Sequence, residues 1–349
     1  MGSQGRNLFL RSITNKIIGF LTDPKTGKAV VQREFGARFA EIDIKTSGGT
    51  DHYDSLQTTL NRRFAQGLTL GLQHTYAHSI GNTDGSNEAR TAANNYSFAA
   101  ERGHNTFDVR HAFNLNALYE VPYGKGRRFG NDAKAFRQAL LGGWQVGGVV
   151  NARAGLPIEV LITRPDVVFR DNRNGNIVTN PIVGPDGAVY TSAIINVPGG
   201  GNSRNVRRPD VVPGVNPYLG NDRLLINPAA FATPQPGTFG NLGRDALHGL
   251  NLVQWDMTVA KRFPVGERTN FEFRGEFYNI LNHTNFAAPS GGQPRLNNSL
   301  GTGANQLQPG QPFTAAAAGG NFGVLTSTVS NQIGLGTNRQ IQFSLRFSF

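Results

Sequence analysis

The sequence predicts an all-β protein, namely a portion of an antiparallel transmembrane β-barrel with about eight long strands. Three observations support this prediction. Apolar side chains recur at every second position in several segments, these segments exceed the usual strand length of soluble domains, and the connections between them alternate between short and long. The 44 Gly and 18 Pro among 349 residues also favour turns and loops over helices.

The clearest strand lies at the end of the chain. Between residues 339 and 349, apolar side chains occupy every second position: Ile341, Phe343, Leu345, Phe347 and Phe349. Gln, Ser and Arg fill the positions between them. This alternation predicts a strand with one apolar and one polar face.

The same period of two predicts seven further strands. They lie at 39–47, 55–64, 68–77, 107–121, 144–151, 255–263 and 271–277. Most are longer than the five or six residues usual in soluble domains, and they approach the 9–11 residues that a tilted strand needs to cross a bilayer. Residues 1–35 are expected to be a poorly defined lead-in, and we predict no helix, with Ala315 to Ala318 as part of a loop.

The connections give an independent indication. Those near residues 65–67 and 263–267 are short and 123–142 is of middling length, whereas 81–104, 163–250 and 285–335 are long. Counting strands back from Phe349 assigns every short turn to the same side. Short periplasmic turns and long extracellular loops are typical of outer-membrane barrels, so 163–250 and 285–335 are expected outside the cell.

The two faces of the strands suit lipid and lumen. The polar face is rich in Asn, Gln, Ser and Thr and carries alternating charges such as Glu272, Arg274 and Glu276. Aromatic residues gather near the predicted strand ends, as in the girdles of membrane barrels; they are Tyr53, Phe64, Tyr76, Phe107, Tyr119, Phe263, Phe277 and Phe349. A soluble carbohydrate-binding sandwich remains an alternative, with shorter strands and a hydrated polar face.

Composition and charge exclude several classes of protein. The absence of Cys excludes disulfide scaffolds and thiol catalysis, and no run of 18 apolar residues predicts a membrane-spanning helix. The net charge of +11 is spread along the chain rather than gathered in a basic run, so nucleic acid is not expected as a partner. The first ten residues lack the apolar core of a secretory signal, so the chain is either cytoplasmic or begins upstream of Met1.

Sites for catalysis, cofactors and metals are not expected. The segment Asp171 to Asn176 resembles a calcium loop, but Arg173 stands where an oxygen ligand is needed, which favours a tight Asn/Gly turn. His74 and His78 share a face of one predicted strand at roughly 13 Å, too far apart for a single ion.

Further along the chain, His104, Asp108 and His111 are expected to split between the two strand faces, so they predict no metal site either. We expect the protein not to be an enzyme.

Several stretches together carry a resemblance to a known family. They are Tyr53 to Phe64 followed by Gly67-Leu-Thr-Leu, Phe107-Asp-Val-Arg-His111, Asn116 to Gly126, Leu141-Gly-Gly-Trp-Gln145, Asn227-Pro-Ala-Ala-Phe231, Gly237 to Arg244, Trp255-Asp256 with Lys261 and Phe263, and Phe273 to His283. This set resembles the C-terminal part of TonB-dependent outer-membrane receptors, specifically the Oar-like group with a carboxypeptidase-regulatory-like domain.

The resemblance implies an outer-membrane location and the import of a large, scarce solute without catalysis. Such receptors have about 22 strands around a plug, so residues 1–349 would be the C-terminal part of a barrel whose plug and N-terminal domain are absent. Outer-membrane lipid would be one partner, and TonB would be reached only through the missing plug. The alternative is a self-contained small barrel acting as a surface adhesin or structural protein, in which the strand at 39–47 would pair with the last strand.

The last strand also resembles the signal read by the barrel assembly machinery. Such a strand pairs by its edge with an open strand of the machinery. Phe343, Leu345, Phe347 and Phe349 are the residues that this resemblance assigns to the signal, although lipid-facing positions would show the same pattern.

Overall fold

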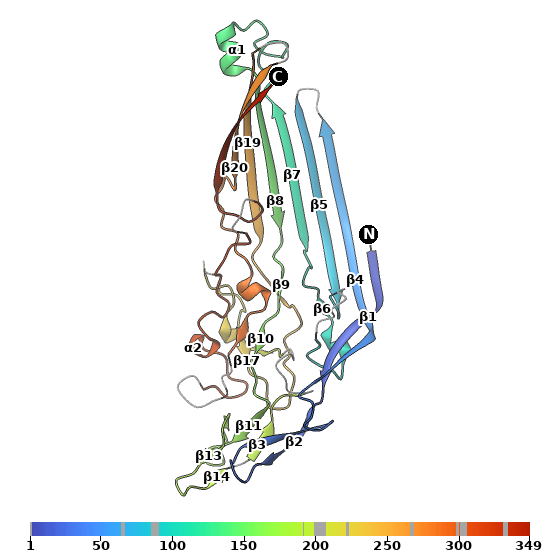
Figure 1. The fold of residues 1–349 in the computed structure, drawn as a ribbon, viewed down its shortest axis with the longest axis vertical. Helices are drawn as coiled ribbons and strands as arrows, with labels where there is room; N and C mark the ends of the chain where they lie inside the picture. Colours follow the sequence, from blue (N-terminus) through green and yellow to red (C-terminus); the bar gives the residue numbers. More distant parts are fainter. Residues whose placement is uncertain are drawn as a thin grey trace.

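The computed structural model describes residues 2–63, 67–84, 91–190, 192–198, 207–220, 223–265, 269–297, 300, 306–330 and 334–349. The molecule is elongated, with a tall sheet at one end and a cluster of loops and short strands at the other (Figure 1). None of the helices in this described part is long and apolar enough to cross a membrane.

The sheet is an up-and-down antiparallel arrangement in which each long strand pairs with the next one along the chain. Its order is β1 (Gly2–Thr14), β4 (Ile42–Arg63), β5 (Leu68–Gly81), β7 (His111–Glu120), β8 (Trp144–Arg153), β19 (Leu252–Pro264), β20 (Asn270–Tyr278) and β22 (Gln340–Ser348). The short β6 (Gly103–His104) adds to the end of β5. The prediction of about eight long antiparallel strands is thus confirmed within the described residues.

The number of long strands is as predicted only because two errors compensate: one strand was missed, and one was predicted as two. Residues 2–14 form β1 although the lead-in was expected to be poorly defined, and residues 42–47 and 55–63 of the strands predicted at 39–47 and 55–64 belong to a single strand, β4, with residue 64 outside the described part. The glycine pair at 48–49 lets β4 continue: Gly48 has a φ of 128°, and a Cβ on Gly49 would lie 3.0 Å from the carbonyl oxygen of Leu8 in β1. The pairing of β1 with β4 shifts register at this point.

Strand β7 begins at His111 and not at Phe107 as predicted. Asp108 is the cause, because its buried carboxylate accepts the backbone N–H of Ser79 in β5 at 2.7 Å. The Asp108 N–H in turn binds the Asn105 carbonyl at 2.9 Å. Residues 105–108 therefore form a turn that packs on the end of β5.

Two short helices contradict the expectation of none. α1 (Ala135–Leu141) consists largely of good helix formers, and the Trp144 indole N–H donates to the carbonyl of Leu140 near its end. α2 (Ala315–Ala318) was expected to be loop, but the Thr314 hydroxyl accepts the N–H of Ala317 and caps it.

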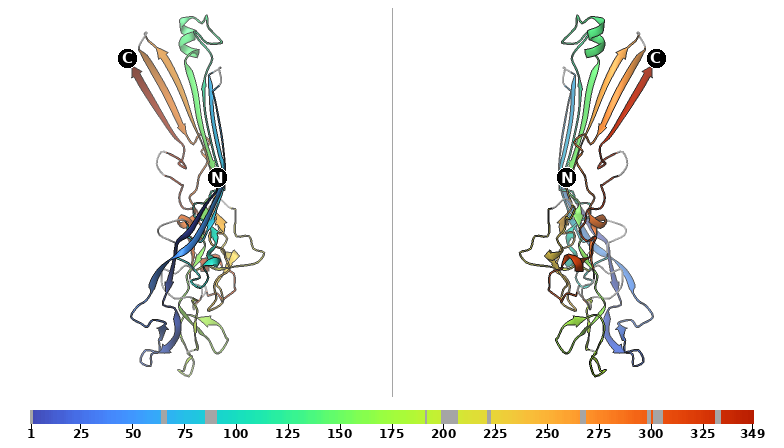
Figure 2. Two further views of the ribbon diagram at one scale, coloured as in Figure 1. Left: turned by 90° about the vertical axis from the view of Figure 1, so that its right-hand side faces the viewer. Right: turned by 90° about the vertical axis from the view of Figure 1, so that its left-hand side faces the viewer.

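The strand ends that the shorter connections join lie together at one end of the sheet, as predicted by counting strands back from Phe349. The end of β4 and the start of β5, the segment from β7 through α1 to β8, and the end of β19 with the start of β20 lie at the end that also holds the C-terminus, and the described parts of the long connections lie at the opposite end (Figures 1 and 2). We refer to these as the turn end and the loop end. They correspond to the short periplasmic turns and long extracellular loops of membrane barrels.

The loop end contains short strands and turns of its own. Their pairs are β2 (Ile17–Thr22) with β3 (Ala29–Arg33), β9 (Pro157–Ile158) with β18 (Leu247–His248), β10 (Leu161–Ile162) with β21 (Arg295–Leu296), β11 (Val167–Arg170) with β12 (Ile177–Val178) and β15 (Ser192–Ile195), β13 (Ile182–Val183) with β14 (Val189–Tyr190), and β16 (Asp210–Val211) with β17 (Phe231–Ala232). Single 3₁₀ turns are η1 (Phe98–Glu101), η2 (Pro228–Ala230) and η3 (Pro289–Gly292).

The main hydrophobic core lies in these loops and not against the sheet. Its buried residues come from 158–162, 225–247 and 296–325. Phe231 and Phe313 are completely or almost completely buried, and the Phe231 ring meets Phe322 edge-on at 6.2 Å. We call the described residues of 155–250 and 285–330 the loop body, because they share this core.

The sheet has two edge strands, β1 and β22, whose outer edges are unpaired in the described residues except at Arg11, which is bridged to Thr91. β1 and β22 are described along their whole length, and no pairing joins them among the described residues. Strand β4, which contains the predicted strand at 39–47, lies between β1 and β5 rather than beside β22. The closure that a self-contained small barrel requires is therefore not seen in this part of the chain.

Candidate functional site

The pairing register brings the apolar positions of neighbouring strands together on one face. Leu60 lies opposite Leu72, Leu72 opposite Leu115, Leu115 opposite Val150, and Val150 opposite Trp255. Directly opposed residues of neighbouring strands share a face. One face of the sheet is therefore apolar across strands β4 to β19, which we call the apolar face.

This face continues to the last strand. Phe271 lies opposite Phe347 with ring centroids 4.8 Å apart, and Phe273 lies opposite Leu345. Leu345 is 71% exposed and Phe343 63%. Large apolar side chains exposed over neighbouring strands are costly in water but are the usual surface of a sheet that contacts lipid tails.

Aromatic side chains lie near both ends of the apolar face. Tyr119 lies opposite Leu68 toward the turn end, and Tyr76 lies eight residues further along β5, about 27 Å away along the strand. The Tyr76 and His111 rings are 5.1 Å apart. This spacing matches the apolar band of about 25 Å between the aromatic girdles of outer-membrane barrels.

Lys261 is a charged residue on the apolar face near the turn end. Its ammonium group donates to the carbonyls of Leu140, at 3.2 Å, and Gly142, and it lies 4.9 Å from the ring centroid of Trp144 and 5.0 Å from that of Phe263. The charge is thus held by the carbonyls at the end of α1 and by two aromatic faces. Lys261 fixes α1 to the sheet at the level of the girdle.

The opposite face of the sheet is polar. Asn114 and Asn151 hydrogen-bond across β7 and β8 at 2.5 Å. Glu272 accepts Arg262 from β19 at 2.7 Å and Arg274 from its own strand at 2.9 Å. Arg262 remains 60% exposed, so these cross-strand contacts leave much of this face accessible.

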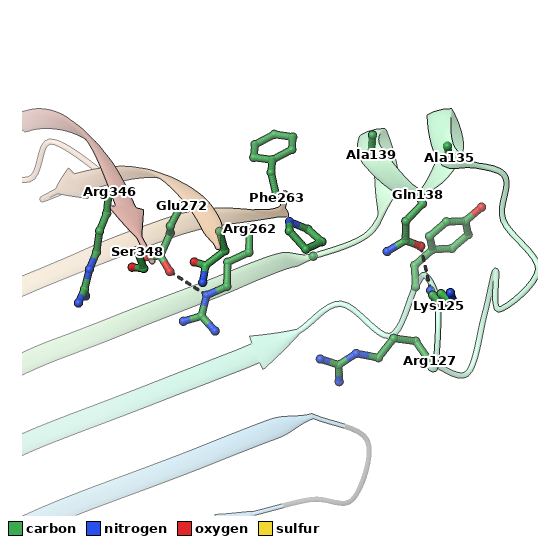
Figure 3. A pocket seen from close by; sticks show the side chains of 14 residues that line it. Lys125, Arg127, Ala135, Gln138, Ala139, Arg262, Phe263, Glu272, Arg346 and Ser348 are labelled. Carbon is green, nitrogen blue, oxygen red and sulfur yellow. Dashed lines mark hydrogen bonds and ion pairs between the residues drawn. The ribbon is translucent and has the colours of Figure 1, made fainter. Parts of the chain in front are cut away.

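A recess of about 780 Å³ opens where the polar face meets the turn end (Figure 3). Lys125 and Arg127 from the connection before α1, together with Arg262 and Arg346 from the sheet, line it. Glu272 is the carboxylate among the lining residues and is already paired with Arg262. The excess of cations suits an anionic group at this end.

In the loop body, a buried guanidinium joins distant segments of the chain. Arg208 forms two hydrogen bonds of 3.0 Å with the Glu101 carboxylate, and it lies 3.5 Å from the carboxylate of Glu159. All three side chains are less than 10% exposed. Burial alone would raise the pKa of Glu101, but the hydrogen bonds and charge of Arg208 outweigh it and hold that pKa below the ordinary carboxyl range.

A second guanidinium, that of the half-buried Arg164, acts in a similar way. Arg164 donates to the carbonyls of Thr238, at 2.7 Å, and Gln235, at 3.0 Å, and to the side chain of Asn196 at 2.8 Å. Burial lowers the pKa of Arg164 to about 10, so the side chain stays protonated at neutral pH. The loop body is therefore held together by the hydrogen bonds of these two cations as well as by its apolar core.

The segment from Asp171 to Asn176 is the tight turn that the sequence favoured. Arg173 donates to both oxygens of the Asp171 carboxylate, at 3.0 and 3.1 Å, and the Gly175 N–H closes the turn onto the Asp171 carbonyl at 2.7 Å. Both oxygens of the Asp171 carboxylate, which a calcium ion would need as ligands, therefore accept hydrogen bonds from Arg173.

The histidines follow their predicted arrangement only in part: the His111 ring stacks on that of His74 and is not part of the group around Asp108. His104 and Asp108 do not belong to one continuous strand: Nδ1 of His104 lies 2.8 Å from Oδ2 of Asp108, and Nδ1 of His78 lies 3.3 Å from the same oxygen. His104 and Asp108 come together because residues 105–108 form a turn instead of the start of β7. The sequence signal for this contact is the spacing of four residues between His104 and Asp108. Such a spacing brings two side chains together in a turn but not in an extended strand.

The surroundings lower the pKa of Asp108 and also that of the neighbouring His248, for different reasons. Burial would raise the pKa of Asp108, but the Ser79 N–H and the hydrogen bonds of His104 and His78 lower it overall. His248 in β18 meets the His104 ring edge-on at 5.1 Å, and burial together with the nearby His104 lowers the pKa of His248. Asp108 is therefore ionised and His248 neutral at neutral pH.

The residues predicted as an assembly signal lie along the edge of the sheet. Phe343, Leu345 and Phe347 are on the apolar face of β22, and Phe349 follows the end of that strand with its ring 5.9 Å from that of Phe347. Phe349 is 95% exposed. The position fits contact with lipid and leaves the outer edge of β22 available for pairing.

These features define a class of protein: one that crosses the outer membrane with β-strands, with an apolar face toward lipid, short turns at one end and long loops at the other. The model of the family described as outer membrane beta barrel domain matches residues 1–342. The chain therefore belongs to this family of outer-membrane β-barrel domains, and its location is the outer membrane. No curated protein and no solved structure matches the chain.

A first prediction concerns the buried ion pair of the loop body. Replacing Arg208 with Met leaves two buried carboxylates without the guanidinium between them, which we expect to lower local stability by about 3–5 kcal/mol at neutral pH. Hydrogen exchange and limited proteolysis of the loop body in isolated outer membranes measure this loss. Lys16→Met is the matched control, because it removes the exposed pair with Glu34 and should cost no more than about 1 kcal/mol.

The pH dependence separates this account from a simple packing defect. In the native protein the lowered pKa of Glu101 contributes stability above the ordinary carboxyl pKa, and this contribution is lost as the pH falls through the lowered value. In Arg208→Met, acid should instead restore stability, because protonation removes the buried charges. Equal pH profiles for the two proteins would contradict the assignment.

Proposed function

We propose that this chain is the C-terminal barrel part of a TonB-dependent outer-membrane receptor that imports a large, scarce solute without catalysis. The observation that carries the proposal is the sheet itself, which spans a membrane but has two open edges. An exposed strand edge within a bilayer leaves backbone N–H and C=O groups without partners, so membrane sheets close. Further strands between β22 and β1 would complete the barrel.

The polar face supports a wide barrel. In a barrel of eight strands the side chains just fill the interior, whereas large barrels of about 22 strands enclose a plug. The polar face here carries long, partly exposed side chains such as Arg262 and Arg274, and it borders the cationic recess. These side chains suit a lumen that holds water and a polar domain.

The loop body supports a role in recognition outside the cell. Loops held by a hydrophobic core and buried ion pairs present a defined surface, which a receptor needs in order to select a scarce solute. The resemblance of the quoted stretches to Oar-like receptors agrees with this role. In this proposal TonB is engaged through a plug domain and not through residues 1–349.

The proposal is tested on the protein isolated from its own outer membrane. An affinity tag inserted after Gly187, which lies in the exposed turn between β13 and β14, allows purification without disturbing the sheet. We expect the tagged barrel to be isolated in one chain or one complex with a plug domain, and to bind the isolated C-terminal domain of TonB. A small heat-modifiable barrel that runs alone and does not bind TonB would favour the adhesin alternative instead.

We further propose that β22 is the strand recognised by the barrel assembly machinery, through Phe343, Leu345, Phe347 and Phe349. β22 pairs with β20 along one edge, which leaves its other edge for strand addition. Outer-membrane lipid contacts the same apolar side chains once the barrel is assembled.

Replacing Phe349 with Ala tests this role. Phe349 lies beyond the last strand pair and is almost fully exposed, so its loss should leave the folded barrel unchanged but reduce the amount that reaches the outer membrane several-fold. Quantitative immunoblotting of heat-modifiable protein in the outer-membrane fraction is the measurement. Ser348→Ala is the neighbouring control, and an equal yield of Phe349→Ala and Ser348→Ala would refute the assignment.

A further inference from the structure

The group formed by His78, His104 and Asp108 brings three metal-binding side chains together at the loop end of β5. The ligand atoms of these residues all lie within 4.8 Å of one another. They come from two segments, since His78 is in β5 whereas His104 and Asp108 flank the turn that leads to β7. Two imidazoles from these two segments therefore converge on one carboxylate.

The distances suit a small cation. Ligand atoms on a tetrahedral zinc ion with bonds of about 2.0–2.2 Å lie roughly 3.3–3.6 Å apart. Oδ2 of Asp108 lies 2.8 Å from Nδ1 of His104 and 3.3 Å from Nδ1 of His78. Small side-chain rotations would therefore place all three atoms around one ion.

The Asp108 carboxylate is held in place through its other oxygen, Oδ1. Oδ1 of Asp108 accepts the Ser79 N–H, and the Ser79 carbonyl and hydroxyl in turn accept the backbone N–H of Asn105 at 3.1 Å and its side-chain amide at 2.9 Å. Asp108, Ser79 and Asn105 are all buried. Such supporting hydrogen bonds orient a ligand before the metal arrives.

The two imidazoles leave a path to solvent. The side chains of His78 and His104 are 34% and 25% exposed, whereas that of Asp108 is 1% exposed. His248, whose ring meets that of His104, is the neighbouring imidazole from the loop body. The positive charge of Arg110 disfavours the binding of a metal cation here, because its guanidinium lies 3.9 Å from Oδ2 of Asp108.

We propose that His78, His104 and Asp108 bind a divalent transition-metal cation of the Zn²⁺ class on the outer side of the membrane. Two imidazoles and one carboxylate are a ligand set that Zn²⁺ accepts, with the fourth position open to water or to His248. The bound ion would connect β5 to the turn before β7. This inference rests on the geometry of the site and does not depend on the proposed transport function.

The test is isothermal titration of Zn²⁺ into the protein purified from outer membranes in detergent after treatment with a chelator. We expect one Zn²⁺ per chain, and at least roughly tenfold weaker binding in His104→Ala and in Asp108→Asn. Asp108→Asn keeps an oxygen that can accept the Ser79 N–H, and heat-modifiable migration shows that each variant is folded. A folded native protein that does not bind Zn²⁺, or variants that bind it equally well, would overturn the proposal.

Two further variants separate a metal site from a hydrogen-bonded group with a purely structural role. Arg110→Gln should strengthen Zn²⁺ binding several-fold, because it removes a cation beside the carboxylate. His74→Ala should leave binding unchanged: His74 stacks on His111 at 5.6 Å and belongs to a separate pair. Loss of binding in His74→Ala with retention in His104→Ala would reject the proposed ligands.

Discussion

The structure depends on one constraint, the register between neighbouring strands that keeps all apolar positions on the same face. Because side chains alternate along a strand, a slip of one residue would turn every apolar side chain of that strand toward the lumen and every polar one toward lipid. The pairing of Leu72 with Leu115, between β5 and β7, and of Phe273 with Leu345, between β20 and β22, shows that apolar positions face one another in both halves of the sheet. The membrane location, the aromatic girdles and the polar face all follow from it.

The loop end is built on a different principle. The sheet gives the loops little apolar surface to pack on, because its apolar face belongs to the membrane and its other face is polar. The loops therefore bury Phe231, Phe313 and their neighbours against one another, and Arg208 ties η1 to the segment after β9 through two carboxylates. The cluster at Asp108 lies where these two parts of the molecule meet.

The sequence allowed the sheet to be predicted better than the loops, for a physical reason. A strand that faces lipid on one side has a strict period of two, which is visible without any tertiary information, as in Ile341 to Phe349. The glycine pair at 48–49 has no side chains to continue the alternation, so two strands were predicted where the structure has one; in the structure these glycines allow close contact with β1. The core of the loop body has no period, since each of its short strands contributes at most two buried residues.

The same reasoning applies to the candidate sites. The assembly-signal residues follow from alternation, so the sequence was enough to place them on one face, and their role remains a proposal. The His78, His104 and Asp108 group could not be found in this way, because it depends on a turn that interrupts an otherwise strand-like segment. Asp108 creates that turn through a bond to Ser79, a contact between residues 29 positions apart.

The most direct measurement of the central claim is a single-cysteine scan of β7, because the native chain has no cysteine. Each position from 112 to 119 would be labelled in turn with a fluorescent probe in the protein reconstituted into bilayers that contain brominated lipid. The account predicts strong quenching at positions 113, 115, 117 and 119 and weak quenching at the positions between them. Quenching without this alternation, or strongest at 114 and 116, would contradict the assignment of the apolar face to lipid.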